Sequence, residues 1–365
     1  MNSDRISINK IKSISLSLDS KSRNWSKNNQ YYLGNDGQQD FICLLNSPTN
    51  SLQFYNLKGE KLNEIKFNTE GPQGTGIISG FLYINQDSIV ILNYQKNQLF
   101  LSNTKGKIIK TYSLYSTVQS DYALRAWSED GSEIFLKKNH LFLPAIPFLN
   151  YRKNPKEYYN KGLLGIDLDL TTSSVRFQIP YPNKEQLIDK PHTTQSIYPK
   201  CISNPASGSL IYSFGIDPYV YEYTTDGVLV KKHFLGTKNT DEKAKPMENR
   251  KELEDPIEEA LNYTNNLCYE RLFFDKFANL YYRIVKHSIP SSNEYTRKDF
   301  NMGKKPWFTY SLIIADNNFN ILDEITLNKD IGSGAFIITK DGVLIQREND
   351  DENHMVFDLY KIAKK

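Results

Sequence analysis

A short apolar pattern recurs six times along the 365-residue chain and constrains its fold more than any other feature. In this pattern an apolar position is followed by a second one three residues later and by a third one two residues after that. The copies are Ile11/Ile14/Leu16, Leu62/Ile65/Phe67, Ile109/Tyr112/Leu114, Val230/His233/Leu235, Leu322/Ile325/Leu327 and the weaker Ser174/Phe177/Ile179. Successive copies are mostly about 50 residues apart, which is the length of a long β-propeller blade.

Each copy is predicted to be the second arm of a β-hairpin. Gly and Asn tolerate the positive φ angles that tight hairpins need, and such residues precede four copies, in Lys58-Gly59, Lys105-Gly106, Asp226-Gly227 and Asp316-Asn317-Asn318. Further apolar strands are expected upstream, at 41–45, 88–92, 208–213 and 279–285. Each unit thus holds three or four antiparallel strands, and its β-branched and aromatic residues exclude helical repeats.

The two ends of the chain predict how the ring closes. After the last copy come three expected strands, at 335–339, 343–347 and 355–362, and no fourth. Residues 8–18 form an outer-strand copy with no blade before it. Pairing the two ends completes the last blade and removes two open sheet edges. The chain is therefore predicted to be an all-β, six-bladed propeller forming a single domain over 1–365. A seventh blade within 236–321 is the disfavoured alternative.

A charged insertion at 238–266 occupies much of that interval. We expect a loop followed by a short helix over 256–262, because Pro256 suits a first helical turn and Asp255 can cap it. The insertion is interpreted as a solvated loop, with a lid over the central cavity as the alternative.

Composition narrows the classes of partner and cofactor. A net charge of +3 does not favour nucleic acid, and 39% hydrophobic with 13% aromatic residues describes a globular protein. Only three cysteines are present, without metal-site spacing, so no metal and no cofactor is expected. We also expect a monomer. The polar N-terminus predicts either a cytoplasmic protein, if Met1 is the native start, or an exported one whose targeting segment has been removed.

Four segments of the chain carry a family resemblance. They are Asn68-Thr69-Glu70-Gly71-Pro72-Gln73-Gly74-Thr75-Gly76, the strand that begins Asp87-Ser88-Ile89, and the segments Tyr269-Glu270-Arg271 and Tyr281-Tyr282-Arg283. Together they resemble the domain-of-unknown-function family 4221. Its members are six-bladed, TolB-like propeller lipoproteins of Bacteroidetes. The resemblance implies a periplasmic or cell-surface location, a lipid anchor as the only membrane contact, and no catalytic residues to carry over. A phosphate-binding loop at 71–76 is disfavoured because the GK[ST] ending is missing.

Propellers usually bind ligands at one mouth of the central channel, in the loops that lead into the innermost strands. Here those loops are 68–77, 115–132, 181–207, 236–271 and 328–334, and the candidate ligand-binding residues are Arg125, Trp127, His192, Tyr198, Glu270 and Arg271. Aromatic platforms beside Arg and His suit a carbohydrate or a small anionic ligand. Taken singly, Trp127 can be a packing residue, Arg271 a surface ion-pair partner, and His192 an exposed loop residue.

The sequence favours a non-catalytic binding or protein-interaction scaffold at the cell envelope. The alternative is a glycan-active hydrolase or lyase with its site at the channel mouth. Candidate carboxylate pairs are Glu270 with Asp275 and Asp121 with Asp130, and glycosidase chemistry would need such a pair about 5 to 9 Å apart. No catalytic residue is assigned.

Overall fold

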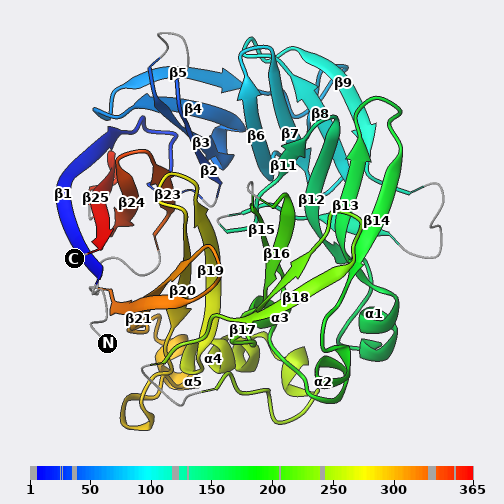
Figure 1. Cartoon of the computed structure of the whole chain (residues 1–365), viewed down its shortest axis with the longest axis vertical. Coiled ribbons are helices and arrows are strands. Elements are labelled where there is room, and N and C mark those ends of the chain that lie inside the picture. The colour runs from blue at the N-terminus through cyan, green and yellow to red at the C-terminus, as the bar shows by residue number, and fades with distance from the viewer. Residues whose placement is uncertain are drawn as a thin grey trace.

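The computed structural model describes residues 6–24, 26, 28–34, 39–116, 123–129, 131–204, 207–238, 243–327, 334–348 and 351–364. Within these ranges the strands form six antiparallel sheets, arranged as blades around a central axis (Figure 1). The predicted six-bladed propeller is confirmed. The interval 236–321 holds the charged insertion and most of the fifth blade, and no further sheet is found among the described residues.

The first three blades follow the chain from its N-terminal side. Blade 1 contains β2 (Asn29–Tyr32), β3 (Phe41–Asn46), β4 (Ser51–Asn56) and β5 (Lys61–Lys66). Blade 2 contains β6 (Gly80–Asn85), β7 (Ser88–Asn93), β8 (Gln98–Ser102) and β9 (Ile108–Ser113). Blade 3 contains β10 (Leu124–Ala126), β11 (Phe135–Lys137), β12 (His140–Pro147), β13 (Leu163–Asp169) and β14 (Val175–Pro180).

The remaining blades carry most of the helical decoration. Blade 4 contains β15 (Lys200–Asn204), β16 (Ser209–Ser213), β17 (Tyr219–Tyr223) and β18 (Leu229–Phe234). Blade 5 contains β19 (Cys268–Asp275), β20 (Leu280–Lys286), β21 (Tyr310–Asp316) and β22 (Ile321–Thr326). Blade 6 contains β23 (Phe336–Thr339), β24 (Gly342–Arg347), β25 (His354–Lys364) and β1 (Ile6–Ser17). The helices are α1 (Pro155–Lys161), α2 (Lys184–Asp189), α3 (Thr194–Ile197), α4 (Pro256–Asn265) and α5 (Arg297–Asn301), with short 3₁₀ turns at Ser47–Thr49, Glu252–Glu254 and Ser291–Asn293.

The ring closes by pairing the first strand with the last. β1 runs antiparallel to β25 from Ile6 opposite Lys364 to Ser17 opposite His354, and the two chain ends lie on the same side of the ring (Figure 1). Ile14 and Leu16 of β1 are buried in the hydrophobic core between blades 6 and 1. The predicted N-terminal closing strand is confirmed, because this pairing gives blade 6 the outer strand that the C-terminal segment lacks.

The repeated apolar pattern marks a β-bulge in the outer strand. In five blades the pairing register shifts by one at the first residue of the pattern, so this residue has no partner across the ladder. The unpaired residues are Ile11, Leu62, Ile109, Val230 and Leu322. In blade 3, where Ser174 takes this place, the register of β14 shows no shift.

The three positions of the pattern therefore lie in different environments. The first residue is exposed in five of the six copies, with 54% exposure for Ile11 and 55% for Ile109. The second and third are mostly buried between blades, as at Ile65 and Phe67. His233, at the second position of its copy, is an exception because it is half-buried. Its Nε2 lies 3.0 Å from Glu222 Oε2 and its ring stacks on Phe319, as expected for a structural histidine.

Arg283 on β20 connects blade 5 to blade 4. Its side chain is fully buried and its guanidinium donates to the carbonyl oxygens of Leu235 at 2.9 Å, Phe214 at 3.2 Å and Asp217 at 2.7 Å, and to Ser213 Oγ at 2.8 Å. Burial lowers the pKa of Arg283 to about 10, so the group still carries its charge at neutral pH. The Arg283 side chain thus donates hydrogen bonds to several backbone carbonyls in the loops that follow β16 and β18 of blade 4.

The charged insertion is held at both ends of α4. Asp255 caps the helix by accepting from Ile257 N at 2.9 Å, so the predicted cap is confirmed, and the helix ends three residues later than expected. Buried Glu259 accepts from Thr194 N at 2.6 Å and pairs with Arg152 at 2.5 Å. At the other end, buried Lys286 donates to the carbonyls of Thr264 and Asn266.

This docking corrects the interpretation of the insertion as a solvated loop. Met247 and Leu253 are almost fully buried, and the helix is tied to blades 4 and 5 by the two anchors just described. The alternative interpretation, a lid that moves over the cavity, stays a prediction.

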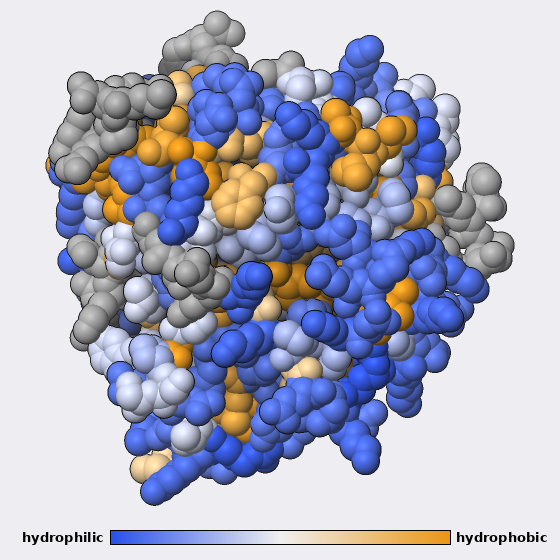
Figure 2. Space-filling view, turned by 60° about the horizontal axis from the view of Figure 1, so that its bottom comes forward, coloured by the Kyte–Doolittle hydropathy of each residue, from blue (hydrophilic) through white to orange (hydrophobic). Residues whose placement is uncertain are grey.

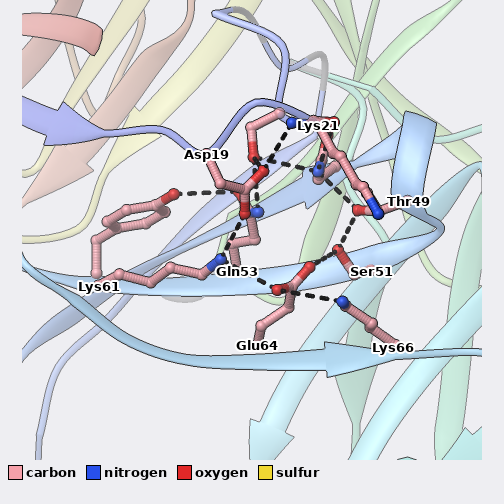
Figure 3. A network of polar contacts seen from close by, with 11 residues as sticks. Asp19, Lys21, Thr49, Ser51, Gln53, Lys61, Glu64 and Lys66 are labelled. Atoms are coloured by element: carbon pink, nitrogen blue, oxygen red, sulfur yellow. Dashed lines mark hydrogen bonds and ion pairs between the residues drawn. The ribbon is translucent and has the colours of Figure 1, made fainter. Parts of the chain in front are cut away.

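A polar network joins the segment after β1 to blade 1 (Figure 3). Lys61 Nζ lies 3.0 Å from both Asp19 Oδ2 and Glu64 Oε2, and Ser51 Oγ donates to Glu64 at 2.7 Å. Gln53 adds a bond of 2.8 Å to Ser22. The network fastens the connection between the closing strand of blade 6 and the first blade.

Replacing Lys61 by Met is expected to make folding less sensitive to acid. Burial alone would raise the pKa of Asp19 and of Glu64. The hydrogen bonds and positive charge of Lys61, together with hydrogen bonds from neighbouring hydroxyls, instead hold both pKa values below their usual range. Carboxyls with a lowered folded pKa stabilise the protein above their unfolded pKa, and this stabilisation is lost as pH falls through the folded pKa. Urea unfolding from pH 6 to pH 3 should show a wild-type advantage of up to about 1 kcal/mol at pH 6 that shrinks at pH 3. An advantage that grows on acidification would contradict this.

Candidate functional site at the channel mouth

A cavity of about 780 Å³ lies where the loops leading into the innermost strands converge. Four of the five predicted loops contribute to it, and only 68–77 does not. Its lining comprises Asn24, Ser26, Trp127, Glu129, Thr194, Gln195, Tyr198, Lys200, Tyr263, Cys268, Glu270, Arg271, Lys305, Gly334, Ala335, Gln346, Arg347, Glu348, His354, Met355 and Val356. The expected position of a site at one mouth of the channel thus coincides with this cavity.

A β-bulge in β19 turns two consecutive side chains towards this cavity. The register between β19 and β20 shifts between Tyr269 and Arg271, which leaves Glu270 unpaired. Neighbouring residues of a regular strand point to opposite faces, whereas a bulge re-aims one of them. Glu270 and Arg271 therefore line the same cavity, as the sequence analysis proposed for both.

Aromatic rings form one wall of the cavity. Trp127 lies edge-to-face with Tyr198, with ring centroids 5.4 Å apart, and with Tyr94 on its other side at 5.8 Å. The Nε1 of Trp127 is buried and has no hydrogen-bond partner. Burial raises the pKa of Tyr198 to about 12, so its phenol stays neutral. Trp127 and Tyr198 thus both line the cavity, while the Trp127 N–H is enclosed by protein.

Charged groups line the rest of the cavity, with four cations against three carboxylates. The cations are Lys200, Arg271, Lys305 and Arg347, and the carboxylates are Glu129, Glu270 and Glu348. Two of the carboxylates are engaged, because Lys200 pairs with Glu129 and the Tyr263 hydroxyl donates to Glu270.

The two arginines of the lining differ in how far their donors are used. Arg271 is only 9% exposed and donates to the carbonyl of Gly334 at 2.6 Å, which corrects its interpretation as a surface residue. The Nε of Arg347 is buried and lacks a hydrogen-bond partner. Both arginines thus line the cavity, Arg271 with one donor engaged by Gly334 and Arg347 with an Nε that is enclosed by protein.

Two of the six candidate residues lie outside this cavity. Arg125 is held between the rings of Tyr94 and Phe148, 4.6 and 4.1 Å from their centroids, and donates to the Tyr94 hydroxyl at 3.2 Å. It supports the aromatic wall from behind. His192 is half-buried and not an exposed loop residue, and burial together with Lys190 lowers its pKa to about 4.

Sequence reasoning missed most of the charged lining. Lys200 and Tyr263 lie in loops that the sequence singles out, but their spacing gives no signal that they face the cavity. Arg347 and His354 flank the acidic hairpin tip, and pairing of β24 with β25 brings both strands to the mouth. A search for charged residues at the ends of predicted strands would have found these two.

The predicted carboxylate pair of Glu270 and Asp275 is not supported. The two residues lie near opposite ends of β19, roughly 15 Å apart at about 3.3 Å per residue, and Asp275 caps a turn by accepting from Phe277 N at 2.8 Å. Asp121 and Asp130 lie outside the described residues. Among the described histidines, cysteines and carboxylates, no group of three or more could hold a metal ion.

Two further cavities adjoin the main one. A cavity of about 230 Å³ shares Ser26, Trp127 and Glu129 with it, and is otherwise lined by Ser128 and by residues in or next to blades 1 and 2. A cavity of about 480 Å³ occupies the channel and is lined largely by aromatic and aliphatic residues of the innermost strands. Glu129 lines all three cavities and therefore lies at their junction.

The fold and the site define a six-bladed β-propeller with a polar, aromatic-walled cavity at one mouth of its channel. The chain belongs to the family described as Domain of unknown function (DUF4221), whose model matches residues 5–326. This confirms the resemblance drawn from the sequence. A DUF4221 protein from Bacteroides vulgatus shares the fold with a TM-score of 0.78, at 15% identity and with 100% of each chain covered.

A more distant structure shares the fold as well. It is a "Putative exported protein" from Bacteroides fragilis, with a TM-score of 0.58 at 10% identity, covering 100% of this chain and 97% of the other. No curated protein matches the chain by sequence. Within the described residues, no helix is long and apolar enough to cross a membrane.

Proposed function

We propose that this protein is a monomeric, non-catalytic binding propeller that holds a carbohydrate or a small anionic ligand at its channel mouth. The observation that carries this proposal is a single cavity of about 780 Å³ whose lining combines the rings of Trp127 and Tyr198 with four cationic and three carboxylate side chains. Aromatic rings beside charged groups suit a carbohydrate or another polar ligand. The excess of cations over carboxylates in the lining supports an anionic one.

The engaged state of the carboxylates favours binding over catalysis. Glu129 is paired with Lys200, and Glu270 accepts a hydrogen bond from the Tyr263 hydroxyl. Burial and the neighbouring Glu270 raise the pKa of Tyr263. A phenol with a raised pKa is a poor general base at neutral pH. The alternative, a glycan-active hydrolase or lyase, rests on the presence of both carboxylates in the same cavity.

The surface gives less support to a protein-interaction scaffold. On the face drawn in Figure 2, hydrophobic residues lie in small separate groups among hydrophilic ones. Docking surfaces are usually larger contiguous apolar patches.

A location at the cell envelope, with a lipid anchor preceding the sequence given, is part of the proposal. It is supported by the lipoprotein character that the family resemblance implies and by the likeness to the "Putative exported protein" of Bacteroides fragilis. Membrane fractionation of the native protein, before and after mild detergent, would test it. Recovery of all the protein without detergent would contradict the anchor.

Replacing Trp127 by Ala is expected to abolish ligand binding while leaving the fold intact. A thermal-shift screen against glycans and small organic acids should find compounds that stabilise the wild type. These compounds should lose their effect on the variant, because an aromatic ring that stacks on a sugar contributes to binding mainly through contact with its face. Trp307→Ala is the matched control, because Trp307 is 76% exposed and lies outside the cavity. Equal stabilisation of wild type and Trp127→Ala would contradict the proposed site.

A further inference from the structure

Trp127 separates two cavities and contributes to both. The large cavity lies on the Tyr198 side of its ring and the small one on the Tyr94 side, since Tyr198 lines only the former and Tyr94 only the latter. The three rings form a row with successive centroid distances of 5.8 and 5.4 Å. The large cavity of about 780 Å³ and the small one of about 230 Å³ thus meet at Trp127, and together they have room for more than one sugar ring.

The small cavity is suited to neutral sugar hydroxyls. It is lined by Asn28, Ser47, Ser79 and Ser128 besides Tyr94 and Trp127, and its charged members are Arg23 and the paired Glu129. Hydroxyl and amide groups can both donate and accept, as sugar hydroxyls do.

The far side of the large cavity is suited to an acidic group. Arg347 and Lys305 both line the cavity, Arg347 as a half-buried and Lys305 as an exposed residue. Glu348, also in the lining, is exposed, so the cation at Arg347 is less solvated than this carboxylate. Hydrogen bonds between a cationic donor and an anionic acceptor are roughly twice as strong as neutral ones.

We propose that the ligand is an acidic oligosaccharide that spans both cavities, with one ring beside Trp127, a neutral end in the small cavity and a carboxylate or sulfate group at Arg347. This inference rests on the proposed function and names the class of ligand. It distinguishes the protein from a binder of single sugars or small acids, which would need the large cavity alone.

An array of neutral, uronate-containing and sulfated oligosaccharides of one to six units tests this proposal with the full chain. We expect wild-type binding confined to acidic oligosaccharides of three or more units, and loss of that binding in Trp127→Ala. Uronate and sulfate arms show which acid is preferred. Binding of neutral and acidic oligosaccharides with equal affinity would overturn the inference and leave the proposed function standing.

Two variants test the ends of the ligand separately, by titration with the tightest array compound. Ser47→Trp should fill the small cavity from an exposed position and weaken a tetrasaccharide at least about tenfold, with Ser113→Trp, at an exposed position outside the cavities described, as the control. Arg347→Gln should weaken the acidic compound about tenfold or more, whereas Arg176→Gln, outside every cavity described, should not. Unchanged affinities in both variants would overturn the inference. Failure of every saccharide and acid to bind would overturn the proposed function as well.

Discussion

Arg283→Ala should lower the free energy of unfolding by about 3–5 kcal/mol, the largest stability effect that we expect from a single substitution. The change removes a fully buried guanidinium and leaves the carbonyls of Leu235, Phe214 and Asp217 without their donor. It also removes the contact with the Tyr269 ring, 4.1 Å from the guanidinium carbon. Urea denaturation followed by tryptophan fluorescence measures the effect, and the midpoint should fall without a rise in the slope.

Two companion variants make this prediction specific. Arg283→Lys keeps the charge but not the planar set of five donors, so it should recover only part of the loss. Arg176→Ala removes a surface arginine paired with Asp167 and Asp226 and should change stability by less than about 1 kcal/mol. A cost for Arg283→Ala no larger than that of Arg176→Ala would mean that the guanidinium does not connect blades 4 and 5. If Arg283→Ala does not fold, the Arg283→Lys variant carries the test.

Glu259→Ala should release α4 from the mouth of the channel without unfolding the propeller. Glu259 is the buried acceptor for Thr194 N and Oγ1, at 2.6 and 2.5 Å, and the ion-pair partner of Arg152. Leaving a buried N–H and a charge unpaired costs about 2–3 kcal/mol, which corresponds to roughly 30- to 150-fold faster opening of the helix. Hydrogen exchange of the α4 amides is the appropriate measurement, because a local opening need not change the global midpoint.

Glu258→Ala is the matched control, one residue away on the same helix. Glu258 is exposed and pairs with Arg297 at 2.7 Å, so its loss should accelerate exchange only slightly. Similar protection in wild type and Glu259→Ala would show that Lys286, at the other end of α4, holds the helix by itself. Because Tyr263 of α4 lines the cavity, the Glu259 variant should also bind ligand more weakly.

The blades could be predicted from the sequence because their information is local and repeated. Hairpin turns such as Lys58-Gly59 and the alternation of the strands depend on neighbouring residues, and Gly59 does adopt a φ of 92°. The bulge at the first residue of five of the six copies could not be predicted, since it depends on pairing with β4, β8, β17, β21 or β25. The docking of the insertion could not be predicted for the same reason: Glu259 and Thr194 are 65 residues apart.

The site was predicted in part. Trp127, Tyr198, Glu270 and Arg271 line the cavity because the loops leading into innermost strands converge in any propeller, and residue type alone singled them out. Arg125 and His192 are residues of the same types but do not line the cavity, Arg125 because it packs on Tyr94 and Phe148, and only side-chain packing distinguishes the two situations. Arg347 was missed because strand pairing, not its local sequence, brings it to the mouth.

The bulges have a consequence for how this protein behaves at high concentration. A propeller leaves one open strand on the rim of every blade, and a regular open strand can pair with a strand from another molecule. In five blades the unpaired residue at Ile11, Leu62, Ile109, Val230 or Leu322 breaks that regularity. The outer strand of blade 3 keeps its register but is interrupted in another way, because Ile179 of β14 has a φ of 70°, so every described rim carries an irregularity that disfavours pairing with a foreign strand.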